Sequence, residues 1–335
     1  MKHKPKITII LLAMFVITQF IGLTVLHADI FHIEQEVNGT IQKVSNPQLS
    51  WIQPPEVQEE NEFFGIFPNL VVAFVIAVLL LFFLSKFEFK VILKAWFFII
   101  ICVALFLSIY AFEKLVLFKI DSTTALIVPA LIALPLAFFK IYKRNFLIHN
   151  ITEFFIYPGI ACVFVPILNI WTIFILLILI SLYDIWAVWH SGIMQKMAKY
   201  QTEKLNIFAG FFVPYYSKKL KEKIKKMKSK FKKTGKKPKN KNIKVNVAML
   251  GGGDIVFPII TAGVLFKTKL VELPFGLSPF QGGLIPALFV IFGATFGLTY
   301  LFLFSEKKKF YPAMPFITSG IFIGIILSYI ISLFV

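Results

Sequence analysis

Residues 245–266 read VNVAMLGGGDIVFPIITAGVLF, an apolar run that holds a single ionisable residue, Asp254. A transmembrane helix needs about 20 mostly apolar residues, so this run is long enough to cross a bilayer. A carboxylate inside such a span costs about 2.5–3.5 kcal/mol and usually faces a bundle interior or a water-filled cavity. The glycines at 251–253 and Pro258 weaken the helix on both sides of Asp254. We therefore expect another helix, or an extended peptide, to lie close to this carboxylate.

The composition of the whole chain agrees with a membrane protein. Of its 335 residues, 58% are hydrophobic, and charged residues make up only 16%, compared with about 25% in soluble proteins. We predict an all-α polytopic membrane protein with nine transmembrane helices. The expected spans are 7–27, 64–85, 91–112, 123–142, 149–167, 169–190, 245–266, 283–304 and 312–334.

A second carboxylate, Asp184, lies inside the sixth expected span. At 1.5 Å per residue, Asp184 and Asp254 are about 9 Å and about 14 Å from the cytoplasmic ends of consecutive antiparallel spans. The two side chains are therefore expected to meet in the cytoplasmic half of the membrane. Two carboxyl groups at close range share one proton. Such a pair can hydrolyse a peptide bond by general acid–base catalysis, with no metal and no cofactor.

The distribution of lysine and arginine predicts the orientation. Lys2, Lys4 and Lys6 precede the first span, whereas the loop 28–63 contains one lysine and is acidic. The more basic loops then alternate along the chain, which places the N-terminus in the cytoplasm and the C-terminus outside. The first span is longer than the apolar region of a signal peptide, so we expect it to be retained. The chain is thus a multi-pass membrane protein, of the cell membrane if prokaryotic.

Most of the net charge of +18 belongs to one connector. Residues 218–244 contain fifteen lysines and only one acidic residue, Glu222. Blocks of like charge repel one another and favour disorder. We expect residues 191–244 to form a partly disordered cytoplasmic loop that can contact anionic lipid and does not bind nucleic acid. This loop would separate an N-terminal membrane bundle, 1–190, from a C-terminal one, 245–335.

Three short motifs lie on the sixth, seventh and ninth expected spans. They are Tyr183-Asp184, Gly251-Gly252-Gly253-Asp254 and Pro312-Ala313-Met314-Pro315. In this order they resemble the YD, GxGD and PAL motifs of presenilins and signal peptide peptidases. Each motif is weak alone, but the combination with nine spans is specific.

This resemblance implies a presenilin-like fold and an intramembrane-cleaving aspartyl protease whose substrates are transmembrane helices of other proteins. It implies that Asp184 and Asp254 are the catalytic pair, and it leaves open whether accessory subunits take part. The predicted orientation, with the N-terminus in the cytoplasm, is similar to that of presenilins. The short loops are typical of an archaeal-type homologue. The residues that would shape the active site are Tyr183, Gly251, Gly252, Gly253, Pro312, Ala313, Met314 and Pro315.

The sequence departs from the family pattern at two positions. Gly252 occupies the variable position of GxGD, where leucine is frequent and which is associated with substrate choice. Met314 replaces the leucine of PAL, a change that conserves volume and is expected to be tolerated.

Other readings of the sequence are a channel or transporter with an intramembrane carboxylate pair, a prepilin-peptidase-like protease, and an inactive scaffold. No inverted repeat is visible, which counts against the transporter, and a prepilin peptidase lacks the PAL motif. The two cysteines, Cys102 and Cys162, both lie in apolar runs, so a disulfide or metal framework is excluded.

Overall fold

In the computed structural model, eight helices of the described part of the chain are long and apolar enough to cross a membrane. They are α1 (Pro5–His27), α2 (Glu60–Lys86), α3 (Lys90–Val116), α4 (Thr124–Tyr142), α5 (Phe146–Phe164), α6 (Ile170–Ile185), α10 (Leu284–Phe304) and α11 (Met314–Ser332). Each coincides with an expected span to within a few residues. The structure describes residues 5–37, 40–55, 57, 60–87, 89–116, 124–143, 145–190, 209–215, 246–268, 270–271, 279–306 and 311–334.

The expected span 245–266 is not one continuous helix. Residues Asn246–Gly251 form strand β4, and the shorter helix α9 (Gly253–Lys267) follows at once. β4 pairs antiparallel with β3 (Gly210–Tyr215), which lies within the segment expected to be a connector. The strand forms because the glycines disfavour a helix, while β3 supplies partners for the backbone of β4. The remainder of the lysine-rich segment, 216–245, lies outside the described residues.

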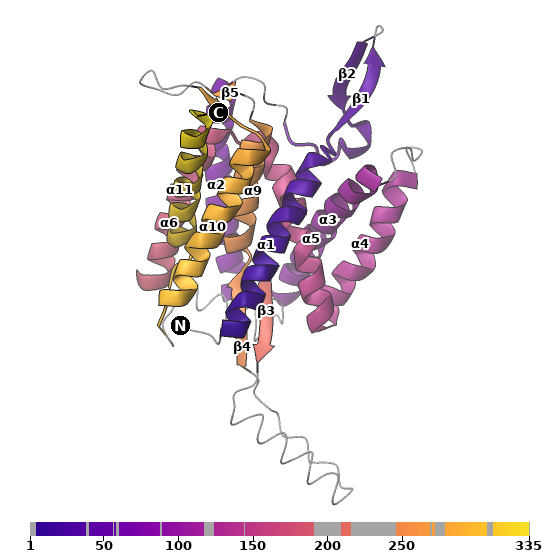
Figure 1. Cartoon of the computed structure of the whole chain (residues 1–335). Coiled ribbons are helices and arrows are strands. Elements are labelled where there is room, and N and C mark those ends of the chain that lie inside the picture. Colours follow the sequence, from indigo (N-terminus) through magenta and orange to yellow (C-terminus); the bar gives the residue numbers. More distant parts are fainter. Residues whose placement is uncertain are drawn as a thin grey trace, which may run out of the picture.

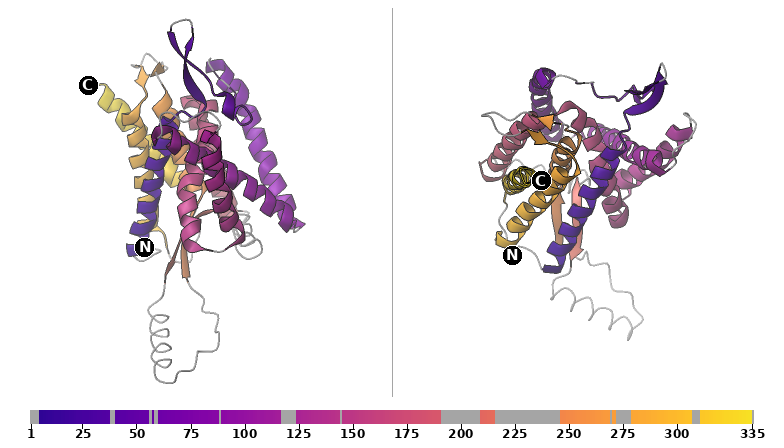
Figure 2. Two further views of the ribbon diagram at one scale, coloured as in Figure 1. Left: turned by 90° about the vertical axis from the view of Figure 1, so that its right-hand side faces the viewer. Right: turned by 45° about the horizontal axis from the view of Figure 1, so that its top comes forward.

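The two ends of the bundle carry different small elements (Figure 1). The N-terminus and the β3–β4 hairpin lie at one end, and the C-terminus lies at the other. At the C-terminal end, β1 (His32–Val37) pairs with β2 (Thr40–Ser45), and β5 (Leu270–Val271) pairs with β6 (Phe280–Gln281). Two short 3-10 turns, Pro47–Leu49 and Val165–Ile167, complete the connections. The views in Figure 2 show the β1–β2 hairpin projecting beyond the helices.

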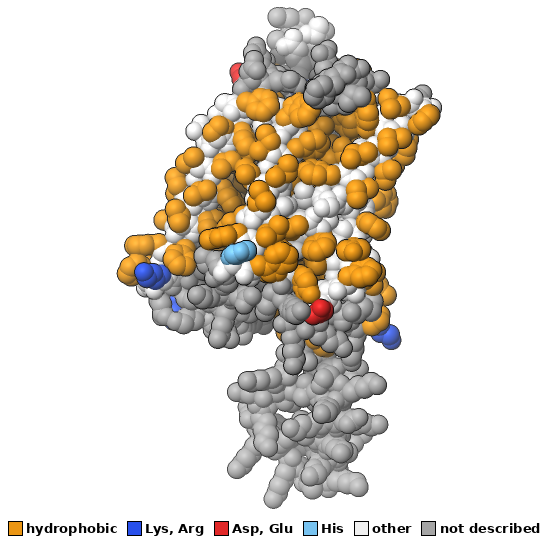
Figure 3. All heavy atoms as spheres, turned by 90° about the vertical axis from the view of Figure 1, so that its left-hand side faces the viewer, with side chains coloured by type: hydrophobic (Ala, Val, Ile, Leu, Met, Phe, Trp, Pro, Cys, Tyr) orange, Lys and Arg blue, Asp and Glu red, His pale blue; other side chains and the backbone are white. Residues whose placement is uncertain are grey.

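Apolar side chains cover the outside of the bundle between its two ends. Figure 3 shows this belt on one face, with the charged side chains in view gathered towards the ends. Exposed isoleucine, leucine and phenylalanine side chains occur on α2, α3, α6 and α10 in particular. A belt of this kind suits contact with lipid, whose hydrocarbon core is about 30 Å thick. Inside it, one core cluster joins α1, α5, α6, α9, α10 and α11, and a smaller one joins α3, α4 and α5.

Helices α10 and α11 approach each other through glycine. A Cβ atom added to Gly293 would lie 2.2 Å from the Gly320 carbonyl oxygen, and one added to Gly324 would lie 2.3 Å from the Phe289 carbonyl oxygen. Such small residues at four-residue spacing let two membrane helices pack backbone against backbone. The contact holds the start of α11 next to α6, where Asp184 lies.

Candidate active site

Asp184 lies in the last turn of α6. This helix begins with a capping box, in which the side chains of Asn169 and Thr172 each bond the backbone of the other residue. After Asp184 the backbone changes to a π-helical turn, Trp186–His190, a deviation that is frequent at functional sites. The Asp184 side chain is buried, with 6% of its residue surface exposed. A buried carboxylate needs hydrogen-bond donors.

The PAL-like segment supplies that donor. Met314 is the first residue of α11, and its backbone N–H donates to Asp184 Oδ2 over 3.0 Å. The first N–H groups of a helix have no partner within the helix, and the positive end of the helix dipole favours an anion there. One turn earlier on α6, Ser181 Oγ donates to Thr318 Oγ1 over 2.9 Å and fixes α6 against α11. The structure therefore brings Asp184 and Met314 together, as the motifs suggested.

Asp254 lies in the first turn of α9, directly after the β3–β4 hairpin. A Cβ atom added to Gly251 would lie 3.1 Å from Asp254 Oδ2, so the carboxylate rests against the glycine backbone. The two aspartates are close enough for their charges to interact. Among the described residues, no group of three His, Cys, Asp or Glu side chains is placed to hold a metal ion.

The other motif residues have distinct surroundings. The ring of Tyr183 packs edge-on against Phe74 of α2, with the ring centroids 6.4 Å apart, and 38% of Tyr183 is exposed. Gly253 is exposed, and a Cβ atom there would meet only Phe257, at 3.9 Å. Pro312 is buried, whereas Ala313 and Pro315 are half-buried beside Met314. The space next to Gly253 is therefore open.

Side chains of α5 hold the outer edge of β3. Asn150 Nδ2 donates to the Phe212 carbonyl over 3.0 Å, and the Phe212 N–H donates to Asn150 Oδ1 over 3.2 Å. His149 Nε2 donates to the Gly210 carbonyl over 2.8 Å. These bonds satisfy the edge of β3 that faces α5. No described strand pairs with the other edge of β4.

A buried ion pair between α4 and α5 also holds the start of β3 in position. Lys140 Nζ on α4 lies 2.5 Å from Glu153 Oε1 on α5, and both side chains are almost fully enclosed. Glu153 Oε1 also accepts the Gly210 N–H over 3.3 Å, which ties the pair to the start of β3. Sequence reasoning missed this cluster. The signal was available, because Lys140 and Glu153 are charged residues inside expected spans, the same criterion that singled out the aspartates.

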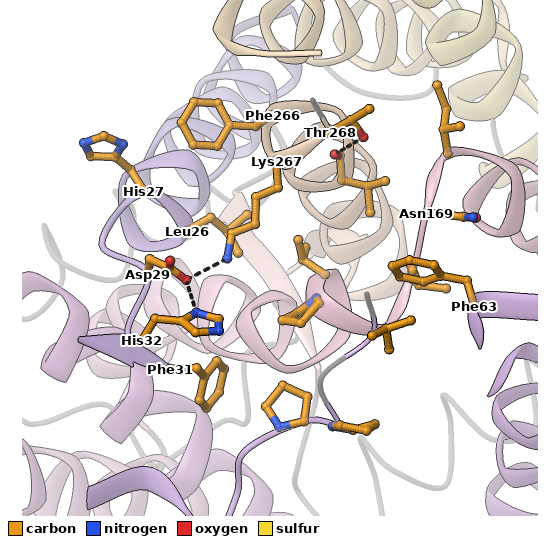
Figure 4. Close-up of a pocket in the computed structure, with 18 of the residues that line it drawn as sticks. Leu26, His27, Asp29, Phe31, His32, Phe63, Asn169, Phe266, Lys267 and Thr268 are labelled. Carbon is orange, nitrogen blue, oxygen red and sulfur yellow. Dashed lines mark hydrogen bonds and ion pairs between the residues drawn. The ribbon is translucent and has the colours of Figure 1, made fainter. Parts of the chain in front are cut away.

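A separate cavity of about 900 Å³ lies at the opposite end of α9 (Figure 4). Asp29, His32 and Lys267 line it, and Asp29 Oδ1 lies 3.1 Å from both His32 Nδ1 and Lys267 Nζ. Burial alone would raise the pKa of the Asp29 carboxyl, but Lys267 and His32 outweigh it and hold the pKa well below its usual range. Lys267 ends α9 and Asp254 begins it, so the cavity is about 20 Å along the helix from the aspartates.

Comparisons with known proteins agree with this arrangement. A structure described as a presenilin family intramembrane aspartate protease, in space group C222, matches with a TM-score of 0.56 and 15% identity, covering 97% of this chain and 99% of the other. The same description in space group P2 matches with a TM-score of 0.53 and 15% identity, covering 96% of each chain. None of the curated proteins compared with the chain matches it.

The sequence itself matches a family. The model of the family described as "Signal-peptide peptidase, presenilin aspartyl protease" matches residues 43–334, a range that includes both aspartates and all three motifs. Neither this match nor the two structures supports the channel or transporter alternative. The chain therefore belongs to the signal-peptide peptidase and presenilin family of intramembrane aspartyl proteases.

Proposed function

We propose that Asp184 and Asp254 are the catalytic pair with which this protease hydrolyses peptide bonds inside transmembrane helices. The observation that carries the proposal is the Met314 N–H, which donates to Asp184 beside a second carboxylate on α9. Because this donor favours the ionised form, we assign the general base to Asp184 and the shared proton to Asp254. Tyr183, Gly251, Gly252, Gly253, Pro312, Ala313, Met314 and Pro315 shape the site around them.

The proposed steps need only these two groups and water. Asp184 takes a proton from the water that attacks the scissile carbonyl carbon, and Asp254 gives its proton to the carbonyl oxygen. The tetrahedral intermediate then collapses: the C–N bond breaks, Asp184 gives its proton to the leaving amine, and one hydroxyl of the intermediate returns a proton to Asp254 as the carbonyl re-forms. At the end the pair again holds one proton, so no metal or cofactor enters the balance.

The cleavage rate of the wild-type protein is expected to be bell-shaped in pH. At low pH Asp184 becomes protonated and can no longer act as base, and at high pH Asp254 loses the proton that it must donate. The two apparent pKa values then belong to the pair. Rates of cleavage of a fluorescent transmembrane peptide, measured in detergent across acid to alkaline pH, test this. EDTA should have no effect; inhibition by EDTA that added zinc reverses would show a metal mechanism instead.

We further propose that substrate binds as an extended strand beside β4. A transmembrane helix must unwind before water can reach its peptide bonds, and each exposed backbone group in a membrane costs several kcal/mol unless it finds a partner. The edge of β4 offers such partners by strand addition. β4 spans Asn246–Gly251 and ends next to Asp254.

Substrates that unwind easily should be cut faster. We expect a leucine-to-glycine change near the scissile bond of a substrate helix to raise kcat, since less helix must be broken. The same change near the far end of the helix is the control and should have little effect. Mass spectrometry of the products should place the cut in the cytoplasmic half. Cleavage near the outer end, or no gain from glycine, would contradict strand addition at β4.

The proposed orientation places the end with the N-terminus, β3 and β4 in the cytoplasm, and the C-terminus outside the cell membrane. The basic residues of the short loops support it. In this arrangement the segment 191–244, which includes β3, connects the bundles 1–190 and 245–335 on the cytoplasmic side. Its lysines would attract anionic lipid of the inner leaflet. Substrates would then lie in the membrane with their N-terminus outside.

A further inference from the structure

Tyr157 on α5 packs against the glycine segment that carries Asp254. A Cβ atom added to Gly252 would lie 2.9 Å from both the hydroxyl oxygen and one ring carbon of Tyr157. The residue is 3% exposed, and its ring also packs edge-on against Phe211 of β3, with the centroids 6.2 Å apart. Tyr157 is therefore fixed between α5, β3 and the start of α9.

The hydroxyl of Tyr157 has no hydrogen-bond partner among the described residues. A buried hydroxyl without a partner costs about 1–3 kcal/mol, so such groups are rare and usually have a role. This hydroxyl interacts electrostatically with two carboxylates: most strongly with Glu153, which lies at the margin of hydrogen-bonding range, and less strongly with Asp254. Glu153 is already satisfied by Lys140 and by the Gly210 N–H. Asp254 is thus the carboxylate with more to gain from the donor.

We propose that Tyr157 is a positioning residue whose hydroxyl donates a hydrogen bond to Asp254 when that carboxyl gives up its proton during catalysis. The inference rests on the proposed role of Asp254 as the general acid. Negative charge develops on Asp254 as the carbonyl oxygen receives the proton, and a donor held ready at that point stabilises the charge without reorganisation. In the resting pair, where Asp254 holds the proton, the hydroxyl has no anion to bind.

The other ionisable groups near this hydroxyl are accounted for. From α5 they are Glu153 and His149, from α4 Lys140, and from α6 Asp184. The described residues of β3 and α11 contain no acidic or basic side chain, and each element carries one tyrosine, Tyr215 and Tyr329. Lys140 compensates the charge of Glu153. Tyr157 lies against Gly252, two residues before Asp254.

The contact between Tyr157 and Gly252 also explains why glycine occupies the variable position of the GxGD motif. The Tyr157 ring fills the space that any side chain at Gly252 would need. A larger residue at 252 would push the ring, and the hydroxyl with it, away from Asp254. Tyr157 and Gly252 therefore form a matched pair in this protein.

The test removes the hydroxyl alone. Tyr157→Phe should lower kcat about tenfold, the value of one hydrogen bond to a charged group, with KM unchanged. The high-pH limb of the rate profile should move to higher pH, because Asp254 then loses its proton less readily. The melting temperature should stay the same or rise, since an unpaired buried hydroxyl is removed. Gly252→Ala should likewise lower kcat and move the high-pH limb to higher pH. In a protein that already carries Tyr157→Phe, Gly252→Ala should change kcat little further.

Tyr110→Phe is the matched control. Tyr110 is also buried, at 6% exposure, but its hydroxyl bonds Asn46 and Gln48 at the opposite end of the bundle. The Tyr110→Phe variant should have a lower melting temperature, with kcat and the pH profile unchanged. If Tyr157→Phe leaves both kcat and the high-pH limb unchanged, the inference is wrong, whereas a lower melting temperature with an unmoved limb would show a structural role only. Asp254→Asn separates the two proposals: if that variant still cleaves, the catalytic assignment itself fails.

Discussion

Asp184→Asn and Asp254→Asn are each expected to reduce proteolysis at least about 10³-fold, because general acid and general base catalysis each contribute about 10²–10⁴-fold. The amide has nearly the same shape as the carboxyl, and its oxygen can still accept the Met314 N–H. Each variant should therefore insert and fold like the wild type. Product formation from a transmembrane peptide, measured with purified protein in detergent, gives the rates, and thermal unfolding checks the fold.

The control for these variants is Asp29→Asn, which makes the same chemical change at the far end of the bundle. It removes the ion pairs of Asp29 with Lys43 and Lys267, so the melting temperature should fall while cleavage persists. Near-wild-type cleavage by either Asp184→Asn or Asp254→Asn would overturn the proposed pair. Equal loss of activity in Asp29→Asn would show that the assay reports stability and not chemistry.

The largest effect on stability is expected from the buried ion pair. Lys140→Met leaves the buried Glu153 carboxylate without its lysine partner and should destabilise the protein by about 3–5 kcal/mol. Because Glu153 also holds the Gly210 N–H, the start of β3 should loosen as well. The melting temperature in detergent measures the first effect, and amide hydrogen exchange at Gly210 and Phe211 measures the second.

Two further variants separate the charge from the packing of Lys140. Lys143→Met makes the same substitution on an exposed lysine of the same segment, which lies over the ring of Phe139 at 5.0 Å, and should cost no more than about 1 kcal/mol. The double variant Lys140→Met/Glu153→Gln removes both charges and keeps an oxygen for Gly210, so it should be more stable than Lys140→Met alone. If Lys140→Met were as stable as Lys143→Met, the pair would be unimportant for the fold.

Most of the membrane architecture was predictable from the sequence. Eight expected spans coincide with α1–α6, α10 and α11, because hydropathy and length depend only on residues that are neighbours in the chain. The order of the three motifs predicted the family, which the family match confirms. The two aspartates were singled out because a carboxylate is rare in any span.

The structure differs where partners come from distant parts of the chain. The expected helix 245–266 begins as strand β4 because β3, more than 30 residues earlier, pairs with it. Neither segment alone reveals the pairing, since a strand is stabilised by the backbone that lies beside it. The PAL-like segment was expected near the pair, but its action, a backbone N–H given to Asp184, depends on the packing of α11 against α6 and α10.

The sequence by itself determined the class of the protein, its spans and the two carboxylates, because burying apolar surface and excluding charge from lipid act on each segment separately. Only the tertiary structure decided that Lys140 compensates Glu153, that α5 holds the edge of β3, and that Tyr157 lies against Gly252. These contacts join side chains and backbone of elements that are separate in the chain, and they depend on direction as well as on residue type. Such contacts exist only after the helices have packed together.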